Sequence, residues 1–315
     1  MPPSLPQYLW MNGKLVPFQD ATIHVSTAAA FYATNVFEGI RVYWNDEKQE
    51  AYAFRLREHF SRWFESMKMM RFSVPYTVEA LEEALREVVK ANNFTEDVHG
   101  YLVAYVDAEG LTATAPVGVY LLFRRRGRLA DDGQGMHCCI SSWVRTSDNA
   151  IPIRLKCGAN YQNGRLASLQ ATADGYDGPI LLNSQGHVAE GSGASFFMVR
   201  KGQVITPPTT ADILESITRV TLMQLFQEEM GLTVKEQEID RTQVYVADEA
   251  FFCGSGYEVT PILSVDRFPV GDGQAGPITQ EILRHYLRVV RGTTDKHAEW
   301  RTPLYQKVLA TAKVP

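Results

Sequence analysis

Short apolar runs separated by turn residues dominate the N-terminal part of the chain. Asn12 and Gly13 stand between the apolar flanks of "YLWMNGKLVPF", which is typical of a hairpin with a two-residue turn. The segments "IRVYW" and "AYAFR" predict two more strands around the polar turn "NDEKQE", and "GYLVAYVDA" and "GVYLLFRRR" predict a further two. Between them, apolar residues at helical spacing predict one helix face made of Phe60, Phe64, Met67 and Met70. The segment "TVEALEEALREVVKANN" repeats that spacing and predicts a second helix.

The C-terminal part mixes strands and helices without regular alternation. Strands are expected in "MHCCISSWV", "PILLN", "SFFMV" and "AFFCG", and helices in "ITRVTLMQLFQEEMG" and "ITQEILRHYLRVV". Because these elements do not alternate as βαβ units would, the prediction is an α+β fold with mixed α/β sheets. The stretch "GRLADDGQG" is the most linker-like. We therefore expect a smaller N-terminal domain at 1–127, an interdomain linker at 128–135 and a larger C-terminal domain at 136–315.

Composition narrows the class of protein. The chain has 315 residues, a length that favours two domains, with one large α/β domain as the alternative. Of these residues 45% are hydrophobic and 21% charged, as is usual for a soluble globular protein. A net charge of -5 gives no reason to expect nucleic acid as a partner. No apolar run approaches the roughly 20 residues of a membrane span, and the first residues lack the pattern of a signal peptide. The expected location is the cytoplasm, with no membrane partner.

Two further patterns indicate ordinary structure. Cys138 and Cys139 are adjacent and the other two cysteines stand alone, so we expect core thiols, with neither a disulfide nor a metal site. The motif "GDGQAG" at 271–276 has the glycine spacing of a dinucleotide-binding loop. However, Pro277 follows it directly and no βαβ unit is expected there, so a plain loop before a helix explains it better.

The stretch "IPIRLKCGANYQNG" places Lys156 between apolar residues and small ones, at what we expect to be the buried end of a strand. A buried, unpaired ammonium is costly, so such a lysine tends to lose its proton and become a nucleophile. Schiff-base chemistry with a carbonyl cofactor is the usual reason to keep one. The alternative is a strand-end lysine that extends its head to solvent.

Neighbouring residues favour the chemical interpretation. Tyr161 is suited to hydrogen-bond a phenolate oxygen, and Glu190 to hold a proton on a pyridine nitrogen, although a carboxylate in a tight turn is the alternative. Ser216 is a plausible N-cap, which would leave the N–H groups of Ile217 and Thr218 as an anion site.

Arg57 opens a predicted helix, where a cation is mildly unfavourable unless an anion binds nearby. Pairing with a nearby carboxylate is the alternative. Together with the residues above, Arg57 completes a set that is suited to bind pyridoxal 5'-phosphate.

The segments "FRLREH", "KCGANY", "HVAEGSGASFF", "LESITR" and "FFCGSGYEVTP", in this order, resemble the fold-type IV pyridoxal-phosphate enzymes. The sequence is most similar to the branched-chain amino acid aminotransferase family, and the similarity covers nearly the whole chain. It implies the two-domain fold of D-amino acid aminotransferase-like proteins and a homodimer with active sites near the subunit interface.

The resemblance also implies roles for individual residues. Lys156 matches the catalytic Schiff-base lysine, Tyr161 the partner of the ring oxygen and Glu190 the partner of the pyridine nitrogen. The remaining cofactor contacts, which match the phosphate-binding residues, are Arg57, Ile217, Thr218 and Ser255. The substrate carboxylate would be bound by Gly256 and Tyr257. The side-chain pocket would be lined by Tyr32, Phe37, Gly39 and Arg41, although Tyr32 and Phe37 also fit a core stripe on a helix.

Three departures from the family pattern affect the substrate. The family usually shows tyrosine, any residue, arginine and proline where this chain has 98–101, "VHGY", so the expected pocket arginine is absent. The arginines 124–126 either form a solvated strand end or supply the missing carboxylate contact. Tyr257 places a large ring where the family often has a small residue.

The predicted function is transfer of the amino group of branched-chain or other apolar L-amino acids to a 2-oxo acid by a ping-pong mechanism. An (R)-selective amine or D-amino acid transaminase of the same fold is the alternative, and the missing arginine is its main support. A lyase of the aminodeoxychorismate lyase type is opposed by the stretch "FEGIR". A non-catalytic relative is opposed by the retained lysine, tyrosine and glutamate.

Overall fold

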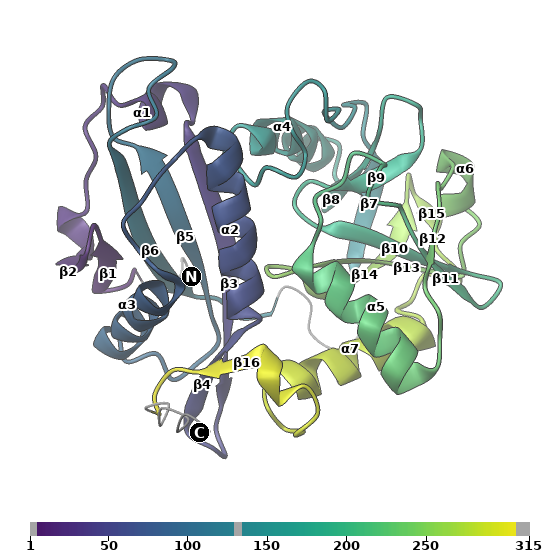
Figure 1. The fold of residues 1–315 in the computed structure, drawn as a ribbon. Coiled ribbons are helices and arrows are strands. Elements are labelled where there is room, and N and C mark those ends of the chain that lie inside the picture. The colour runs from purple at the N-terminus through teal and green to yellow at the C-terminus, as the bar shows by residue number, and fades with distance from the viewer. Residues whose placement is uncertain (1–4, 129–133, 307–315) are drawn as a thin grey trace, which may run out of the picture. The chain divides into compact units, whose positions relative to one another are not determined.

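The computed structural model describes residues 5–128 and 134–306, and these form two compact units (Figure 1). The first unit holds the chain up to Gly127 and also the segment from Leu287 onwards, and the second runs from Arg128 to Tyr286. Most of the predicted linker at 128–135 lies outside the described residues.

A seven-stranded antiparallel sheet forms the centre of the first unit. Its strands, in spatial order, are β16 (Arg301–Pro303), β4 (Glu50–Phe54), β3 (Asn35–Asn45), β5 (Val98–Val106), β6 (Val117–Arg125), β1 (Tyr8–Met11) and β2 (Lys14–Pro17). The predicted hairpin is confirmed, since Asn12 and Gly13 both have positive φ, as the two central residues of a type I′ turn require.

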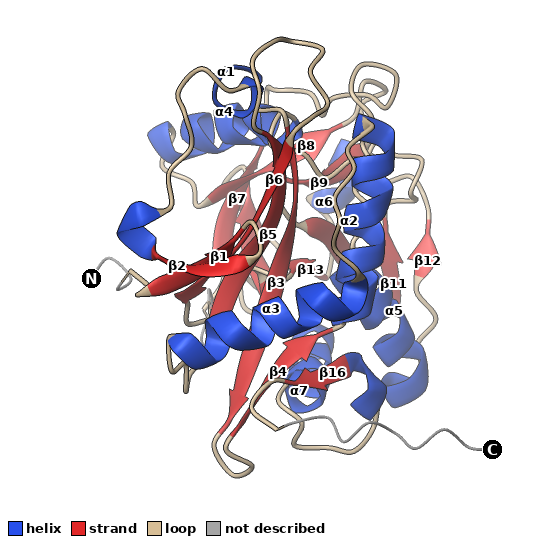
Figure 2. Cartoon of the chain, turned by 60° about the vertical axis from the view of Figure 1, so that its left-hand side comes forward, coloured by secondary structure: helices blue, strands red, loops and turns tan. Residues whose placement is uncertain are grey.

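Two long helices pack against this sheet, as Figure 2 shows. The helices of the unit are α1 (Ala28–Tyr32), α2 (Leu56–Met70) and α3 (Val78–Ala91), with the 3-10 turns η1 (Phe18–Asp20) and η2 (Ala298–Trp300). The buried face of α2 contains Phe60 and Met67, as the sequence predicted, but its third large residue is Trp63, while Phe64 and Met70 are only partly buried.

The second unit is built on a mixed sheet that closes on itself. Its strands, in spatial order, are β12 (Lys235–Glu236), β11 (Gln203–Thr206), β10 (Ser195–Arg200), β13 (Glu249–Gly254), β14 (Glu258–Val265), β7 (Met136–Ile140), β8 (Gly178–Leu182) and β9 (Val188–Gly191), with β15 (Phe268–Pro269) beside β14. Because β9 also pairs with β10, the strands from β10 round to β9 form a closed ring. The prediction of mixed sheets is confirmed, since β7 runs parallel to β8 and β14 while most other pairs are antiparallel.

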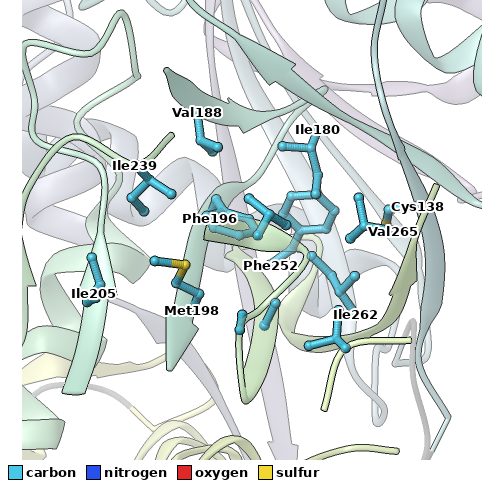
Figure 3. Packing of buried hydrophobic residues seen from close by; sticks show 14 of the residues in the cluster. Cys138, Ile180, Val188, Phe196, Met198, Ile205, Ile239, Phe252, Ile262 and Val265 are labelled. Carbon is cyan, nitrogen blue, oxygen red and sulfur yellow. The ribbon is translucent and has the colours of Figure 1, made fainter. Parts of the chain in front are cut away.

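The interior of this ring is an apolar core (Figure 3). Phe196 and Phe252 point into it from adjacent strands and meet edge to face, with ring centroids 6.2 Å apart. Since side chains alternate along a strand, their neighbours Phe197 and Phe251 lie on the other side of the sheet, where they stack with centroids 5.0 Å apart. The helix α5 covers that side with Phe226.

The helices of the second unit are α4 (Asn160–Ala173), α5 (Ile217–Met230), α6 (Arg241–Val244) and α7 (Pro277–Val290), whose residues from Leu287 onwards belong to the first unit. The predicted plain loop at 271–276 is confirmed, since Pro277 is the first residue of α7. The carboxylate of Glu249 accepts hydrogen bonds from the N–H groups of Ile278 (3.0 Å) and Thr279 (2.7 Å). The start of this helix is therefore already satisfied by a side chain of the protein.

The C-terminal segment differs from the expected domain, which ran without interruption from 136 to 315. The chain from Leu287 onwards belongs to the first unit because β16 pairs with β4. The buried carboxylate of Glu50 adds four bonds at this point, accepting from the N–H groups of Ala51 and of Leu304, Tyr305 and Gln306. A strand of three residues is too short to show an apolar pattern in the sequence. The sequence therefore did not predict that the C-terminal segment joins the first unit.

Candidate functional site

Lys156 lies in a loop, and the predicted strand end is wrong. Apolar side chains around it are buried, but the backbone makes turn bonds, such as Leu155 N–H to the carbonyl of Pro152 at 3.2 Å. Asn160 holds this turn, since its Nδ2 donates to the carbonyls of Pro152 (3.0 Å) and Leu155 (2.8 Å). Lys156 is partly buried, and its Nζ donates to the hydroxyl of Tyr161 at 2.6 Å. The loop thus brings the candidate lysine and tyrosine together.

Tyr161 is fixed by the close approach of α4 to the turn between β9 and β10. A Cβ atom added to Gly164 on α4 would lie 2.6 Å from the carbonyl oxygen of Ser192, so any side chain there would push the helix away. On the same turn, a Cβ at Gly193 would be 3.7 Å from Cε1 of Tyr161. The tyrosine ring therefore lies against the small residues that directly follow Glu190.

Glu190 is a buried carboxylate with a cationic partner. Its Oε1 accepts from Nε of Arg145 at 2.9 Å, and its Oε2 accepts from the N–H of Leu214 at 3.3 Å. Burial raises the pKa of Glu190 above its ordinary value, while Arg145, the Leu214 N–H and Lys156 oppose that rise. The charge of Lys156 therefore acts on this carboxylate, in the same direction as that of Arg145.

Ser195 adds a buried hydroxyl beside this carboxylate. It is paired with Glu190 across β9 and β10, and directly paired residues have their side chains on the same side of a sheet. Its side chain is buried, and within the described residues its Oγ has no hydrogen-bond partner. An orphaned hydroxyl is costly in a protein interior, so this one is suited to contact a polar ligand.

The start of α5 provides N–H groups for an anion. Ser216 is the N-cap, as predicted, and its hydroxyl accepts from the N–H of Arg219 at 3.3 Å. In the part of the chain that the structure describes, no acceptor is bonded to the N–H of Ile217 or Thr218. The positive end of this helix is therefore open to a phosphate.

The turn after β13 contains the residues predicted for the phosphate and the substrate carboxylate. Ser255 and Gly256 connect β13 to β14, but the N–H of Tyr257 already donates to the carbonyl of Gly254 at 3.1 Å. The ring of Tyr257 packs against Phe252, with centroids 6.0 Å apart, at the edge of the apolar core. The amide of Tyr257 is thus engaged within the turn, and its contact with a substrate carboxylate stays a prediction.

Residues predicted for the side-chain pocket lie together on the first unit. Phe37, Gly39 and Arg41 alternate along β3 and share the side of the sheet that faces away from α2. His99 and Tyr101 on β5 pair with Arg41 and Gly39 and lie on that same side. The ring of Tyr101 is 6.1 Å from that of Phe37 and 5.1 Å from that of His99.

Tyr32 and Arg57 are exposed. Tyr32 ends α1 with half of its surface accessible, and Phe37 is in a strand, so the alternative of a helical core stripe is wrong. Arg57 is near the start of α2, with its Nε 3.3 Å from a carboxylate oxygen of Glu82. This pairing matches the alternative that the sequence left open, and a phosphate contact of Arg57 stays a prediction.

Comparisons with known proteins agree with this set of residues. The model of the family "Amino-transferase class IV" matches residues 35–265. A probable branched-chain-amino-acid aminotransferase of Aquifex aeolicus (strain VF5) is 38% identical over 305 residues, which cover 95% of this chain and 97% of that protein. This chain belongs to the class IV aminotransferase family.

Solved structures extend the agreement to the fold. The PLP-form (holo-form) of a branched-chain amino acid aminotransferase from Thermobaculum terrenum is 40% identical, with a TM-score of 0.91, and the match covers 96% of this chain and 99% of that one. The branched-chain aminotransferase from the archaeon Thermoproteus uzoniensis, solved with norvaline, is 38% identical with a TM-score of 0.89, covering 95% and 100%. The predicted fold-type IV architecture is thereby confirmed.

The structure of this aminotransferase clarifies the missing arginine. Gly100 lies on the side of β5 that faces Phe123, and a Cβ there would be 2.3 Å from the Phe123 ring. No larger residue fits at this position. The residues of "VHGY" on the same side of the sheet as Phe37 are instead His99 and Tyr101.

Of the three arginines at 124–126, Arg124 is the one paired with His99, so it lies on that same side of the sheet. Arg125 forms an ion pair with Glu96. The register thus separates the two arginines, which the sequence alone did not.

The sequence missed two residues of the Glu190 site, Arg145 and Ser195. Arg145 is 45 positions before Glu190 in "SSWVRTS", a segment without periodicity. Ser195 looked like the first residue of an apolar strand. Neither has a local pattern that could have identified it.

Proposed function

We propose that this chain is a pyridoxal 5'-phosphate-dependent aminotransferase that transfers the amino group of branched-chain or other apolar L-amino acids to a 2-oxo acid. The observation that supports it most is one site in the second unit, where the Lys156–Tyr161 pair lies within electrostatic reach of the buried Glu190–Arg145 pair. A lysine with a phenol and a buried carboxylate with a cation are the groups that this chemistry requires.

The residues present fit this cofactor. The open N–H groups of Ile217 and Thr218, with the hydroxyl of Ser255, would hold the phosphate, and Glu190 would hold the ring nitrogen. The orphaned hydroxyl of Ser195 supports a polar ligand beside Glu190. Arg57 remains a further candidate for the phosphate.

When bound, pyridoxal phosphate supplies a reactive aldehyde carbon and a ring that accepts electrons. Lys156 Nζ would hold the aldehyde carbon and, once the substrate amine has replaced it there, would take the proton from the substrate Cα and carry it as a general base. The Tyr161 hydroxyl orients Nζ through their 2.6 Å hydrogen bond. Glu190, as a carboxylate, would keep the proton on the ring nitrogen.

The substrate class rests on the relatives and on the first unit. Both curated and solved relatives carry the name branched-chain aminotransferase, and one was solved with norvaline, an amino acid with an apolar side chain. The side of β3 and β5 that contains Phe37, Gly39 and Tyr101 offers an aromatic surface for an apolar side chain. Tyr32, Arg41 and Gly256 complete the proposed substrate contacts.

An (R)-selective amine or D-amino acid transaminase is the second candidate. It is favoured by Gly100, which stands where the family pattern has an arginine, so that the side of β5 shared with Phe37 carries His99 and Tyr101. The loss of that cation changes which substrate carboxylate can be bound there.

The deciding experiment adds L-leucine or (R)-1-phenylethylamine to the purified yellow holoenzyme with no 2-oxo acid present. We expect L-leucine to remove the visible absorption of the protein-bound cofactor, and a 2-oxo acid to restore it. Conversion by the amine alone would favour the second candidate. Pyruvate release without an added acceptor would point to a lyase, and no conversion by any amino donor would refute the proposal.

A homodimer in the cytoplasm is proposed as well. Exposed apolar side chains on and beside α1, among them Phe31 and Leu111, each 69% exposed, are suited to bury against a second copy.

All four cysteines are free thiols, which fits a reducing compartment. None of the helices in the described residues is long and apolar enough to cross a membrane.

A further inference from the structure

Arg145 is held from two directions. Its backbone N–H donates to the carbonyl of Leu182, the last residue of β8, at 2.7 Å. Its side chain is buried and aims Nε at Oε1 of Glu190 on the neighbouring strand β9, at 2.9 Å. Because both its backbone and its side chain are hydrogen-bonded, the Arg145 guanidinium does not turn towards solvent. The fold therefore sets the geometry of its ion pair with Glu190.

Glu190 has few groups that can keep it charged. The charged groups that act on it are Arg145, from the loop after β7, and Lys156, from the loop before α4. Within 5–128 and 134–306, the loop before α5 contributes the Leu214 N–H, and β10 contributes the neutral Ser195. Burial raises the pKa of Glu190, and Arg145 is the largest of the opposing influences. Without Arg145, the carboxyl would therefore take up a proton at a higher pH.

We propose that Arg145 is a positioning residue for transamination, which holds Glu190 as an oriented carboxylate so that it can accept a hydrogen bond from the protonated ring nitrogen of the cofactor. The inference rests on the proposed function. Arg145 would act through Glu190, which its Nε contacts. A neutral Glu190 would donate its own proton, and the ring would lose the positive charge that makes it an electron acceptor.

The test compares Arg145→Met, which keeps length without charge, with Arg145→Lys, which keeps charge. In stopped-flow half-reactions of the holoenzyme with L-leucine, we expect Arg145→Met to be slowed about tenfold or more at neutral pH. Its rate should rise with pH towards the wild-type rate, because Glu190 ionises there. Arg145→Lys should retain the wild-type shape of the pH profile. Arg241→Met, which removes an exposed arginine from Asp266, is the matched control and should change nothing.

A second readout does not depend on turnover. Infrared spectra of the Arg145→Met holoenzyme at neutral pH should contain a protonated-carboxyl band that is absent from wild type and from the Arg145→Met/Glu190→Gln double variant. A rate loss that is equal at every pH, or no such band, would overturn the inference and assign Arg145 a structural role only. Failure of the wild-type protein to transaminate any amino donor would instead refute the proposed function, so the two failures are distinguishable.

Discussion

Replacing Glu38 with glutamine should destabilise the first unit in a pH-dependent way. Glu38 lies on β3 with no exposed surface, and both of its oxygens are bound by α2. Nε of Arg62 is 2.7 Å from Oε1, Nη2 of Arg62 is 2.8 Å from Oε2, and Nδ1 of His59 is 2.7 Å from Oε2. Glutamine keeps the shape of the side chain but removes the charge that binds this helix to the sheet.

The magnitude follows from the pKa of Glu38. Burial alone would raise it, but the charge of Arg62 and the hydrogen bonds from Arg62 and His59 outweigh burial and lower the pKa from 4.5 to about 2. That difference corresponds to about 3 kcal/mol in favour of the charged form in the folded state. Because the folded-state pKa is lowered, this stability is complete above about pH 4.5 and is lost as the pH falls towards 2.

Tryptophan fluorescence in urea measures this effect with little interference. Of the five tryptophans, only Trp143 is in the second unit, so the signal reports mainly on the first. We expect Glu38→Gln to lower the free energy of unfolding by about 3 kcal/mol at pH 7, with the gap to wild type narrowing below pH 4.5. Glu96→Gln, which removes a partly exposed partner of Arg125, is the control and should cost at most about 1 kcal/mol. A gap that is absent at pH 7, or constant down to pH 3, would refute the reasoning.

Three further changes test other contacts. Glu50→Gln should speed hydrogen exchange of the three N–H groups that follow β16 by about tenfold or more, because each of them bonds to the buried carboxylate. Unchanged exchange rates would show that the strand pairing alone holds the segment. Gly276→Ala places a Cβ 2.1 Å from Cδ of Glu249, so thermal unfolding should show a loss of about 1–3 kcal/mol, whereas wild-type stability would mean that Glu249 is not held by α7. Arg124, which is paired with His99, is a candidate to bind the side-chain carboxylate of 2-oxoglutarate. In that case Arg124→Met should raise KM for 2-oxoglutarate roughly fivefold at constant kcat. An unchanged KM would mean that Arg124 is a solvated strand end.

Local patterns in the sequence predicted what depends on local physics. The Asn12–Gly13 turn, the Ser216 cap of α5 and the Pro277 start of α7 each follow from the conformational preferences of one or two residues. The mixed sheets followed from strands that do not alternate with helices. Elements of this kind need no knowledge of distant residues.

Local sequence patterns did not predict that the second sheet closes on itself. This closure depends on β9, a strand of four residues whose apolar part is a single Val-Ala pair, and on its pairing with both β8 and β10. A strand that short does not show a period of two. The prediction that Lys156 ends a strand was wrong for a related reason. Its apolar residues are buried as predicted, but Asn160 binds the carbonyls that a strand would have used for a neighbouring strand.

The electrostatic partners of buried carboxylates are the part of the site that pattern reasoning reaches least. Glu38 and Arg62 are 24 positions apart, and Arg145 and Glu190 are 45 apart, so only the fold brings each pair together. Yet the two carboxylates have opposite pKa directions. Two partners lower the pKa of Glu38, whereas a single guanidinium and two weaker contacts leave that of Glu190 raised. The charged form of Glu38 is already stabilised by its partners, so a further cation would add little. The charged form of Glu190 is still disfavoured by burial, so a nearby cation would stabilise it more. That difference is what we would expect between a residue that joins a helix to a sheet and a residue that receives the protonated ring of a cofactor.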